Sequence, residues 1–280
     1  MHLLTTPAAM RDWSVGQRAD GATLAFVPTM GALHTGHHHL IEIAAARGQP
    51  VVSIFVNPMQ FNRSDDFDAY PRPIDADLDA CRELGAVAVY APTAAAMYPD
   101  GFETRVEPGA LADPLEGAGR PGHFAGVTTV VAKLFHAVDP HVAVFGQKDY
   151  QQLAIVRRMV RDLDWGIEIV GVPTVREADG LALSSRNRLL GPADRSAAVC
   201  VSAALRAVER CWIAGERDPG RLEAAGDAVV SAEPRARLEY LRVVDRSTLL
   251  APTDIASPGL VVLAAVWFGT VRLIDNVELG

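Results

Sequence analysis

The chain has 280 residues, 49% of them hydrophobic, so it can form one large domain or two smaller ones around a buried core. Its formal net charge of -8 at pH 7 argues against a broad electrostatic footprint for nucleic acid. The longest apolar run, Leu260 to Phe268, is much shorter than a membrane-spanning helix needs to be.

The first predicted unit is a strand, a turn and a helix. Residues 23–27 are an apolar run that predicts a buried strand, and residues 40–46 predict a helix. Between them lies the sequence PTMGALHTGH, residues 28–37, with two glycines and two histidines. A helix N-terminus offers unpaired N–H groups and a positive dipole end, and glycines let the backbone approach a ligand closely. We therefore expect His34 and His37 to bind a polyphosphate here.

These two histidines have other interpretations. As hydrogen-bond donors, His34 and His37 would contact phosphate oxygens while charge develops during phosphoryl or nucleotidyl transfer. They could also be ordinary turn residues, because His38 and His39 follow directly and a run of histidines is a weak signal. A zinc site of His34, His37 and His38 is the weakest alternative, because no carboxylate lies at metalloprotease-like spacing.

A second strand and a second helix follow. Residues 50–56 form a continuous β-branched run, typical of a strand covered on both faces, and Asn57-Pro58 ends it. Residues 59–72 predict a loop, and Pro73 fits the first turn of a helix that runs to about Leu84. Asp75, Asp77 and Asp79 lie near the start of that helix, where acidic side chains are stabilised by the helix dipole. Contact with magnesium is the second interpretation of these residues.

The next part of the chain continues the alternation. Residues 86–90 predict a third strand, and the Gly- and Pro-rich residues 92–126 predict a long functional loop. The elements expected after it are a helix at 126–138, a strand at 141–145, a helix at 150–163 with Asp149 as its N-cap, and a strand at 168–172.

Strands and helices alternate to about residue 175, which predicts a doubly wound α/β domain with a parallel sheet over residues 1–175. Ligands of such sheets bind beyond the carboxyl ends of the strands. Three strand ends carry unusual polar residues: the histidine turn, Asn57 to Gln60, and Gly146-Gln147-Lys148-Asp149. We therefore expect these three segments to converge on one edge of the sheet.

The remaining side chains have a functional and a structural interpretation each. Lys148 can neutralise phosphate charge, or it can be a solvated surface lysine. Amides such as Gln60 and Gln152 can hydrogen-bond a small substrate, and the pattern does not separate this role from surface polarity. The same choice stays open for Asn57 and His123.

After residue 175 the pattern changes to helices followed by strands. Residues 192–215 and 218–231 predict helices, and residues 238–244, 260–268 and 271–276 predict strands. This order predicts a smaller α+β domain over residues 176–280. At its start, Ser184-Ser185-Arg186-Asn187 offers hydroxyls and a guanidinium that can bind a triphosphate, or it is a linker of turn residues.

Several classes of protein are excluded by missing motifs. No GxGxxG follows a strand, and neither GxxxxGK[ST] nor GxSxG is present. The three cysteines, Cys81, Cys200 and Cys211, form no CxxC pair, and the N-terminus lacks the features of a signal peptide. We expect a protein of the reducing cytoplasm, with no membrane and no nucleic acid among its partners.

Six segments, in this order and spacing, resemble the pantoate–β-alanine ligase family within the HIGH-type nucleotidyltransferases. They span nearly the whole chain and are residues 28–37, 55–61, 70–72, 120–127, 145–152 and 183–187. The resemblance implies a Rossmann-like, doubly wound domain that binds ATP and pantoate, a smaller C-terminal lid domain, and a homodimer.

The resemblance also implies a reaction in two steps that uses ATP and Mg²⁺. The pantoate carboxylate attacks the α-phosphorus of ATP, which gives pantoyl adenylate and pyrophosphate, and the amine of β-alanine then displaces AMP to form pantothenate. Such an enzyme positions reactants and stabilises charge without a side-chain nucleophile. A different enzyme of the superfamily, acting on a phosphorylated acceptor, and a non-catalytic nucleotide-binding protein remain alternatives.

Residue by residue, the resemblance implies catalytic roles for His34, Lys148 and His37, the last as a proton donor. It places ATP at Met30, Gly31, Ala32, Leu33, His34, Thr35, Gly36, His37, Gly146, Gln147, Lys148, Asp149, Val175, Leu183, Ser184, Ser185 and Arg186. Pantoate would contact Gln60 and Gln152, and Gln60 would also help to place β-alanine.

Three further assignments complete the expected site. Asn57 and His123 are additional candidates for binding pantoate or β-alanine. Asp77 is the remaining candidate magnesium ligand, because Ala76 interrupts an acidic cluster that some relatives carry. Gln147 stands where the family usually has Glu, and we expect ATP to bind nevertheless because Lys148 and Asp149 are present.

Overall fold

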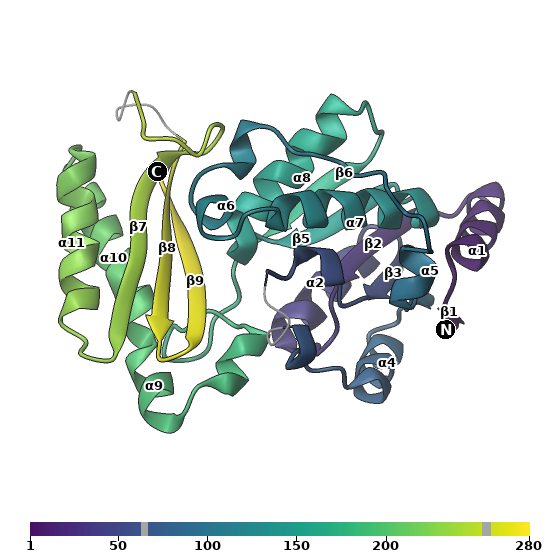
Figure 1. Cartoon of the computed structure of the whole chain (residues 1–280), viewed down its shortest axis with the longest axis horizontal. Coiled ribbons are helices and arrows are strands. Elements are labelled where there is room, and N and C mark those ends of the chain that lie inside the picture. The colour runs from purple at the N-terminus through teal and green to yellow at the C-terminus, as the bar shows by residue number, and fades with distance from the viewer. Residues whose placement is uncertain (63–66, 254–258) are drawn as a thin grey trace. The chain divides into compact units, whose positions relative to one another are not determined.

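The computed structural model describes residues 1–62, 67–253 and 259–280 (Figure 1). The chain forms two compact units: Met1–Gln147 with Ile155–Val172, and Lys148–Ala154 with Pro173–Gly280. The predicted loop at 59–72 includes residues 63–66, which lie outside the described residues. The division of the chain into domains at residues 1–175 and 176–280 stays a prediction.

The first unit contains a parallel sheet. Its strands are β1 (His2–Leu4), β2 (Leu24–Thr29), β3 (Gln49–Ile54), β4 (Ala88–Tyr90), β5 (Val142–Gly146) and β6 (Glu168–Val172). Among the described residues these six strands pair in the order β1-β4-β3-β2-β5-β6, every pair parallel. The chain winds from β2 to β3 and β4 in one direction and crosses back to β5 and β6 in the other. The predicted doubly wound α/β fold is confirmed.

Helices connect these strands. They are α1 (Pro7–Ala19), α2 (Thr35–Ala45), α4 (Ile74–Glu83), α5 (Ala94–Met97), α6 (Glu116–Gly119), α7 (His123–Val138) and α8 (Tyr150–Asp162), with 3-10 helices η1 (Pro58–Gln60), η2 (Ala110–Ala112) and η3 (Gln147–Asp149). The predicted loop at 92–126 was wrong in part, because it contains α5, η2, α6 and the first residues of α7. Helices of three or four residues are too short to produce a detectable period in the sequence.

Strand β2 is buried on both faces. Ala25 and Val27 pack in a cluster with Ile41 of α2. The ring of Phe26, which points to the opposite face, meets Phe135 of α7 edge-on at 6.2 Å between centroids. Alternate side chains of one strand therefore bind helices on the two sides of the sheet. This packing fixes the position of the carboxyl end of β2, where the histidine turn begins.

The helix and the strand that precede residue 23 were not predicted from the sequence. Strand β1 pairs with β4, and α1 covers residues 7–19. The start of α1 has a readable signal, because Thr6 caps the helix by accepting the Ala9 N–H at 3.2 Å and Pro7 follows it.

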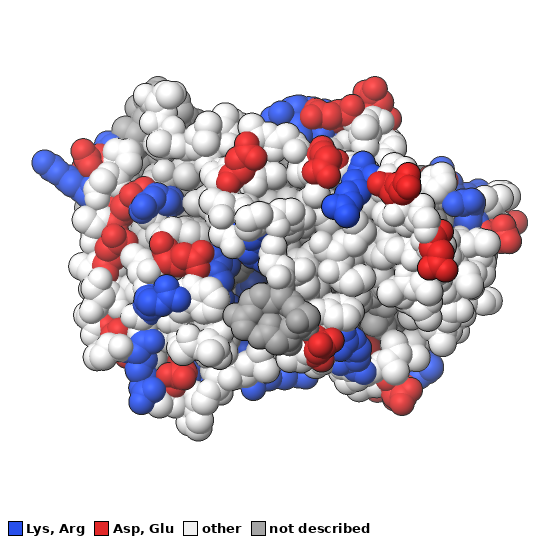
Figure 2. Space-filling model, viewed as in Figure 1, with Lys and Arg blue, Asp and Glu red and all other residues white. Residues whose placement is uncertain are grey.

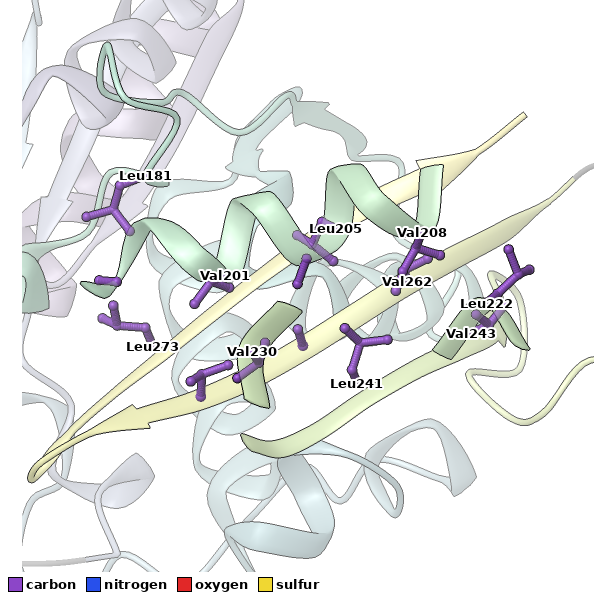
Figure 3. Close-up of a cluster of buried hydrophobic side chains, with 14 of the residues drawn as sticks. Leu181, Val201, Leu205, Val208, Leu222, Val230, Leu241, Val243, Val262 and Leu273 are labelled. Atoms are coloured by element: carbon purple, nitrogen blue, oxygen red, sulfur yellow. The ribbon is translucent and has the colours of Figure 1, made fainter. Parts of the chain in front are cut away.

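The second unit is α+β, as predicted. It contains η4 (Ser185–Leu189), α9 (Pro192–Ala197), α10 (Val199–Ile213), α11 (Pro219–Ser231), β7 (Ala236–Asp245), β8 (Leu260–Phe268) and β9 (Val271–Leu279). Where the structure describes it, the sheet is antiparallel in the order β7-β8-β9. Figure 3 shows its core, in which Val201 and Leu205 of α10 and Leu222 of α11 lie with Leu241 of β7 and Val262 of β8.

The surface carries both signs of charge. On the face drawn in Figure 2, Lys and Arg side chains lie interspersed with Asp and Glu side chains. None of the helices in the described part of the chain combines the length and the apolar character that crossing a membrane requires.

Candidate active site

The polar segments of the first unit meet where the sheet changes winding direction. Strand β2 lies between β3 and β5, so the segments after these strands leave the same edge as neighbours. Direct contact joins two of the segments, because Gln60 Nε2 lies 3.3 Å from Met30 Sδ. Gly146 ends β5 at this edge, and Gln147 follows it. The convergence predicted for these parts of the three segments is confirmed, and such a position is where open α/β sheets bind ligands.

The histidine turn has an unusual backbone. Gly31 has a φ of +78° and Ala32 a φ of +50°, so two successive residues are left-handed. The Gly31 N–H donates to Thr29 Oγ1 at 3.1 Å, and that hydroxyl donates to the Ser53 carbonyl at 2.6 Å. The start of the turn is thereby tied to the neighbouring strand β3.

A carboxylate holds the next two residues of the turn. Asp77 Oδ2 accepts the Ala32 N–H and Asp77 Oδ1 accepts the Leu33 N–H, each at 2.8 Å. The Asp77 side chain belongs to α4, and the residue is only 3% exposed. The role predicted for Asp77 as a magnesium ligand stays a prediction. In the described ranges, no group of three or more His, Cys, Asp or Glu residues is arranged to hold a metal ion.

His34 is the N-cap of α2, and His37, at the third helical position, completes a capping box with it. The predicted helix began at Leu40, but α2 begins at Thr35, so His37 lies in its first turn. The His34 Nδ1 accepts the Gly36 N–H at 3.1 Å, and the His34 N–H donates to His37 Nδ1 at 3.3 Å. The two rings lie 4.1 Å apart between centroids.

This capping arrangement determines the tautomer of both rings. A backbone N–H can only donate, so each Nδ1 that it contacts must be an acceptor without a proton. A neutral imidazole then carries its proton on Nε2. Both His34 and His37 therefore present an Nε2–H donor, and the helix start places these donors side by side.

Gln60 is oriented by Asn57. The Asn57 Nδ2 donates to Gln60 Oε1 at 3.0 Å and to the Gly126 carbonyl at 3.1 Å. The Asn57 Oδ1 accepts the Met59 N–H at 3.2 Å and the Tyr98 hydroxyl at 2.7 Å. Asn57 is 1% exposed. Because its amide is engaged within the protein, it fixes which end of the Gln60 amide is the donor.

The main chain of Gln60 is held as well. His123 Nδ1 lies 2.8 Å from the Gln60 carbonyl oxygen, and Arg120 Nη2 donates to the same oxygen at 3.1 Å. Arg120 Nη1 lies 3.2 Å from His123 Nε2, so the His123 proton belongs on Nδ1, where it can donate to the carbonyl. The structure thus places Asn57 and His123 around Gln60. Their direct contact with pantoate or β-alanine stays a prediction.

In the second unit, strand β9 holds the Lys148 segment. The Asn276 Nδ2 donates to the Lys148 carbonyl at 2.9 Å, and the Tyr150 hydroxyl donates to Glu278 Oε1 at 3.2 Å. The Lys148 Nζ lies 3.8 Å from Asp149 Oδ1. Gln152 lies half-buried in α8, two residues after Tyr150.

The predicted ATP residues of the 175–187 segment lie close together. The Leu183 N–H donates to the Val175 carbonyl at 2.9 Å, which closes a hairpin. The Ser184 side chain then caps η4 by accepting the Arg186 N–H at 3.3 Å, and Ser185 begins that helix. The second unit therefore brings Val175 next to residues 183–186.

Three residues that shape the site were not predicted as site residues: Arg120, Tyr98 and Asn276. Arg120 lies in a segment that carried the family resemblance, which is a usable signal. Asp77 was considered only as a metal ligand. Tyr98 and Asn276 have no local signal, because they act on Asn57 and Lys148 through contacts between distant parts of the chain.

The fold and the turn define an α/β protein whose histidine turn lies at the switch point of a parallel sheet. The chain belongs to the family described as pantoate-beta-alanine ligase, whose sequence model matches residues 2–278. The resemblance inferred from the sequence is therefore confirmed, and the chain is a ligase that joins pantoate to β-alanine through a carbon–nitrogen bond.

Named relatives support this membership. A pantothenate synthetase of Acidobacterium capsulatum is 53% identical over 259 residues, which cover 92% of this chain and 86% of that one. A pantothenate synthetase of Geobacter sulfurreducens is 47% identical over 281 residues, covering 100% and 99%. The crystal structure of pantothenate synthetase from Thermus thermophilus has a TM-score of 0.93 at 45% identity and 99% coverage of both chains.

One related structure carries ligands. The pantoate-beta-alanine ligase of Francisella tularensis, complexed with beta-gamma ATP and beta-alanine, has a TM-score of 0.82 at 32% identity, with 99% of this chain and 97% of that chain covered. All these similarities extend over nearly the full length of the chain, so they concern both units.

Proposed function

We propose that this ligase makes pantothenate from pantoate, β-alanine and ATP through pantoyl adenylate. A pantoate carboxylate oxygen attacks the α-phosphorus, the bond to the β-phosphate breaks, and pyrophosphate leaves. The β-alanine amine then attacks the acyl carbon, the bond to the phosphate oxygen breaks, AMP leaves, and the nitrogen loses a proton. The observation that carries this proposal is the pair of Nε2–H donors at the switch point of the sheet.

We assign His34 and His37 to the phosphates of ATP as neutral hydrogen-bond donors. Negative charge develops on the departing pyrophosphate, and donors that are already aimed stabilise it without reorganisation. If a ring took up a second proton, Nδ1 would become a donor and would lose its hydrogen bond from the backbone. We therefore refine the proton-donor role of His37 to hydrogen-bond donation without complete proton transfer.

Gln60 is our principal contact for pantoate. The Gln60 Oε1 accepts a hydrogen bond from Asn57 Nδ2, so the Nε2 of the Gln60 amide lies on the side away from Asn57. The acceptor near Nε2 in the protein is the thioether of Met30, which is a weak one. A carboxylate or hydroxyl oxygen is a better partner for this N–H group, and pantoate has both. Gln152 is the second proposed contact for pantoate.

We propose the other contacts to ATP for whole segments of the chain. Met30 to His37, Gly146 and Gln147 supply them from the first unit, and Lys148, Asp149, Val175 and residues 183–186 from the second. Lys148 and Arg186 offer the positive charge that a triphosphate requires.

Magnesium is proposed only as the counter-ion that ATP brings. The described residues do not form a cage of carboxylates for it, and both Asp77 oxygens accept hydrogen bonds from the backbone. Mg²⁺ commonly keeps several waters and binds through substrate phosphates. We also propose a homodimer in the cytoplasm, on the basis of the family resemblance and the cysteine pattern.

The test of the reaction is isotope exchange. With ATP, Mg²⁺ and pantoate, the protein should exchange labelled pyrophosphate into ATP, and addition of β-alanine should give pantothenate and AMP in equal amounts. Absence of pantoate-dependent exchange would contradict the adenylate mechanism. Exchange that β-alanine leaves unchanged, with no AMP released, would indicate a nucleotidyltransferase with another acceptor.

A further inference from the structure

Asp77 reaches the histidine turn from a distant part of the sequence. It lies in the first turn of α4, some 45 residues after Ala32, and its two carboxylate oxygens each accept one N–H of the turn at 2.8 Å. Hydrogen bonds to a charged acceptor are stronger than neutral ones. Since Asp77 is 3% exposed, water does not compete for these bonds.

The turn requires such support. Ala32 is left-handed, a conformation that costs free energy for any residue with a Cβ, and Gly31 before it is left-handed too. The carboxylate also packs against the turn, because a Cβ on Gly31 would lie 2.8 Å from Asp77 Oδ2 and 3.0 Å from Ile54 Cγ2. The backbone therefore fits into a space that Asp77 and Ile54 define.

The consequence reaches the histidines directly. Leu33 immediately precedes His34, the N-cap residue whose backbone N–H binds His37 Nδ1. A shift of the backbone at residue 33 would change the direction of both rings. The N–H groups of Ala32 and Leu33 are themselves engaged by Asp77.

We propose that Asp77 is a positioning residue that holds residues 31–33 in the conformation that aims the donors of His34 and His37 at ATP. This role rests on the proposed function of the two histidines. It differs from a magnesium ligand, because the carboxylate acts on the protein backbone and its effect does not depend on the metal.

The test compares Asp77→Asn with Asp75→Asn. Asparagine keeps the shape but has a single acceptor oxygen, so one of the two N–H groups loses its partner. Asp75 is an exposed acid in the same helical turn, and its replacement makes the same change in charge and in the helix dipole. The primary measurement is hydrogen–deuterium exchange of the amides of Ala32 and Leu33 in the unliganded proteins.

We expect exchange of the amide that loses its partner, at residue 32 or 33, to be about tenfold faster in Asp77→Asn, the effect of losing one hydrogen bond to a charged group, and exchange of both amides to be unchanged in Asp75→Asn. Unchanged exchange in Asp77→Asn would overturn the proposal. If that variant does not fold, the wild type decides: slow exchange of both amides supports the proposal, and exchange as fast as that of an exposed loop overturns it. These measurements do not require ligase activity. A failure of the positioning proposal can therefore be distinguished from a failure of the proposed reaction.

A second measurement separates positioning from metal binding. We expect the rate of pyrophosphate exchange by Asp77→Asn to fall about tenfold and to stay low as Mg²⁺ is raised. Recovery of the full rate at high Mg²⁺ would show that Asp77 is a metal ligand and would overturn the positioning role.

Discussion

The protonation of His34 and His37 is determined by the backbone of their own helix. Each Nδ1 accepts an N–H at the start of α2, so each ring carries its proton on Nε2. The sequence was sufficient to select these histidines, because they stand in a Gly-containing turn between a strand and a helix. It did not predict their capping roles, because the apolar period that locates a helix begins only at Leu40.

Replacement of His37 tests its catalytic role. We expect His37→Ala to lower the rate of pyrophosphate exchange by about 10²-fold, the scale of losing one donor to a developing charge. His39→Ala is the matched control, because His39 is half-exposed and pairs with Glu42 at 3.3 Å on the surface of the same helix. A nearly normal rate in His37→Ala would mean that the turn only shapes the ATP site.

Tyr98→Phe tests how Gln60 is oriented. Burial raises the pKa of Tyr98 far above its usual range, so its hydroxyl stays protonated and donates to Asn57 Oδ1. Without that bond the Asn57 amide can rotate and release Gln60. We expect KM for pantoate to rise about fivefold, corresponding to one neutral hydrogen bond, and KM for ATP to stay constant.

The control for this change is Tyr90→Phe. The Tyr90 hydroxyl is also buried, but its hydrogen-bond partner among the described residues is the Met97 Sδ, at 3.4 Å. Steady-state kinetics with pantoate as the varied substrate should therefore distinguish the two variants. Equal KM values for pantoate in both would argue that Tyr98 has no part in orienting Gln60.

At the level of elements, helix α7 packs directly on the backbone of η1. A Cβ on Gly126 would lie 2.3 Å from the Met59 carbonyl oxygen and 2.8 Å from the Gln60 nitrogen. We expect Gly126→Ala to destabilise the fold by about 1–3 kcal/mol and to raise KM for pantoate, because α7 must move away from Gln60. Denaturant unfolding and pantoate kinetics would measure the two effects.

Gly16→Ala is the matched control for the change at Gly126. Gly16 lies inside α1, and a Cβ there meets nothing within 4 Å. Alanine should stabilise this helix by about 0.5–1 kcal/mol because it loses less conformational freedom than glycine. Equal stability changes at both positions would contradict the close packing inferred for α7 and η1.

Elements with a clear hydrophobic period were predicted well, and short ones were not. Strand β6 has the predicted residues, Glu168–Val172, because a β-branched run is followed by a proline. The three-residue strand β1 and the four-residue helices α5 and α6 were missed, since a few residues cannot establish a period of 2.0 or 3.6. Their existence depends on pairing and packing with other parts of the chain.

At the level of the whole molecule, the homodimer is a prediction that hydrodynamics can test. One chain has a mass of 29.9 kDa, and we expect sedimentation to show a species of twice that mass at micromolar concentration. The prediction rests on the family resemblance. A single species of 29.9 kDa under the same conditions would contradict it.

The sequence by itself determined the class of fold, the histidine turn and the family. These properties depend on neighbouring residues: the periods of strands and helices, the glycines of a turn, and the order of six short motifs. The tertiary structure decided what holds the turn and Gln60 in place. Asp77 binds the turn from more than 40 residues away, and Tyr98 binds Asn57 across 41 residues. No local pattern encodes such contacts, because they arise only when the order β1-β4-β3-β2-β5-β6 brings separate segments to one edge of the sheet.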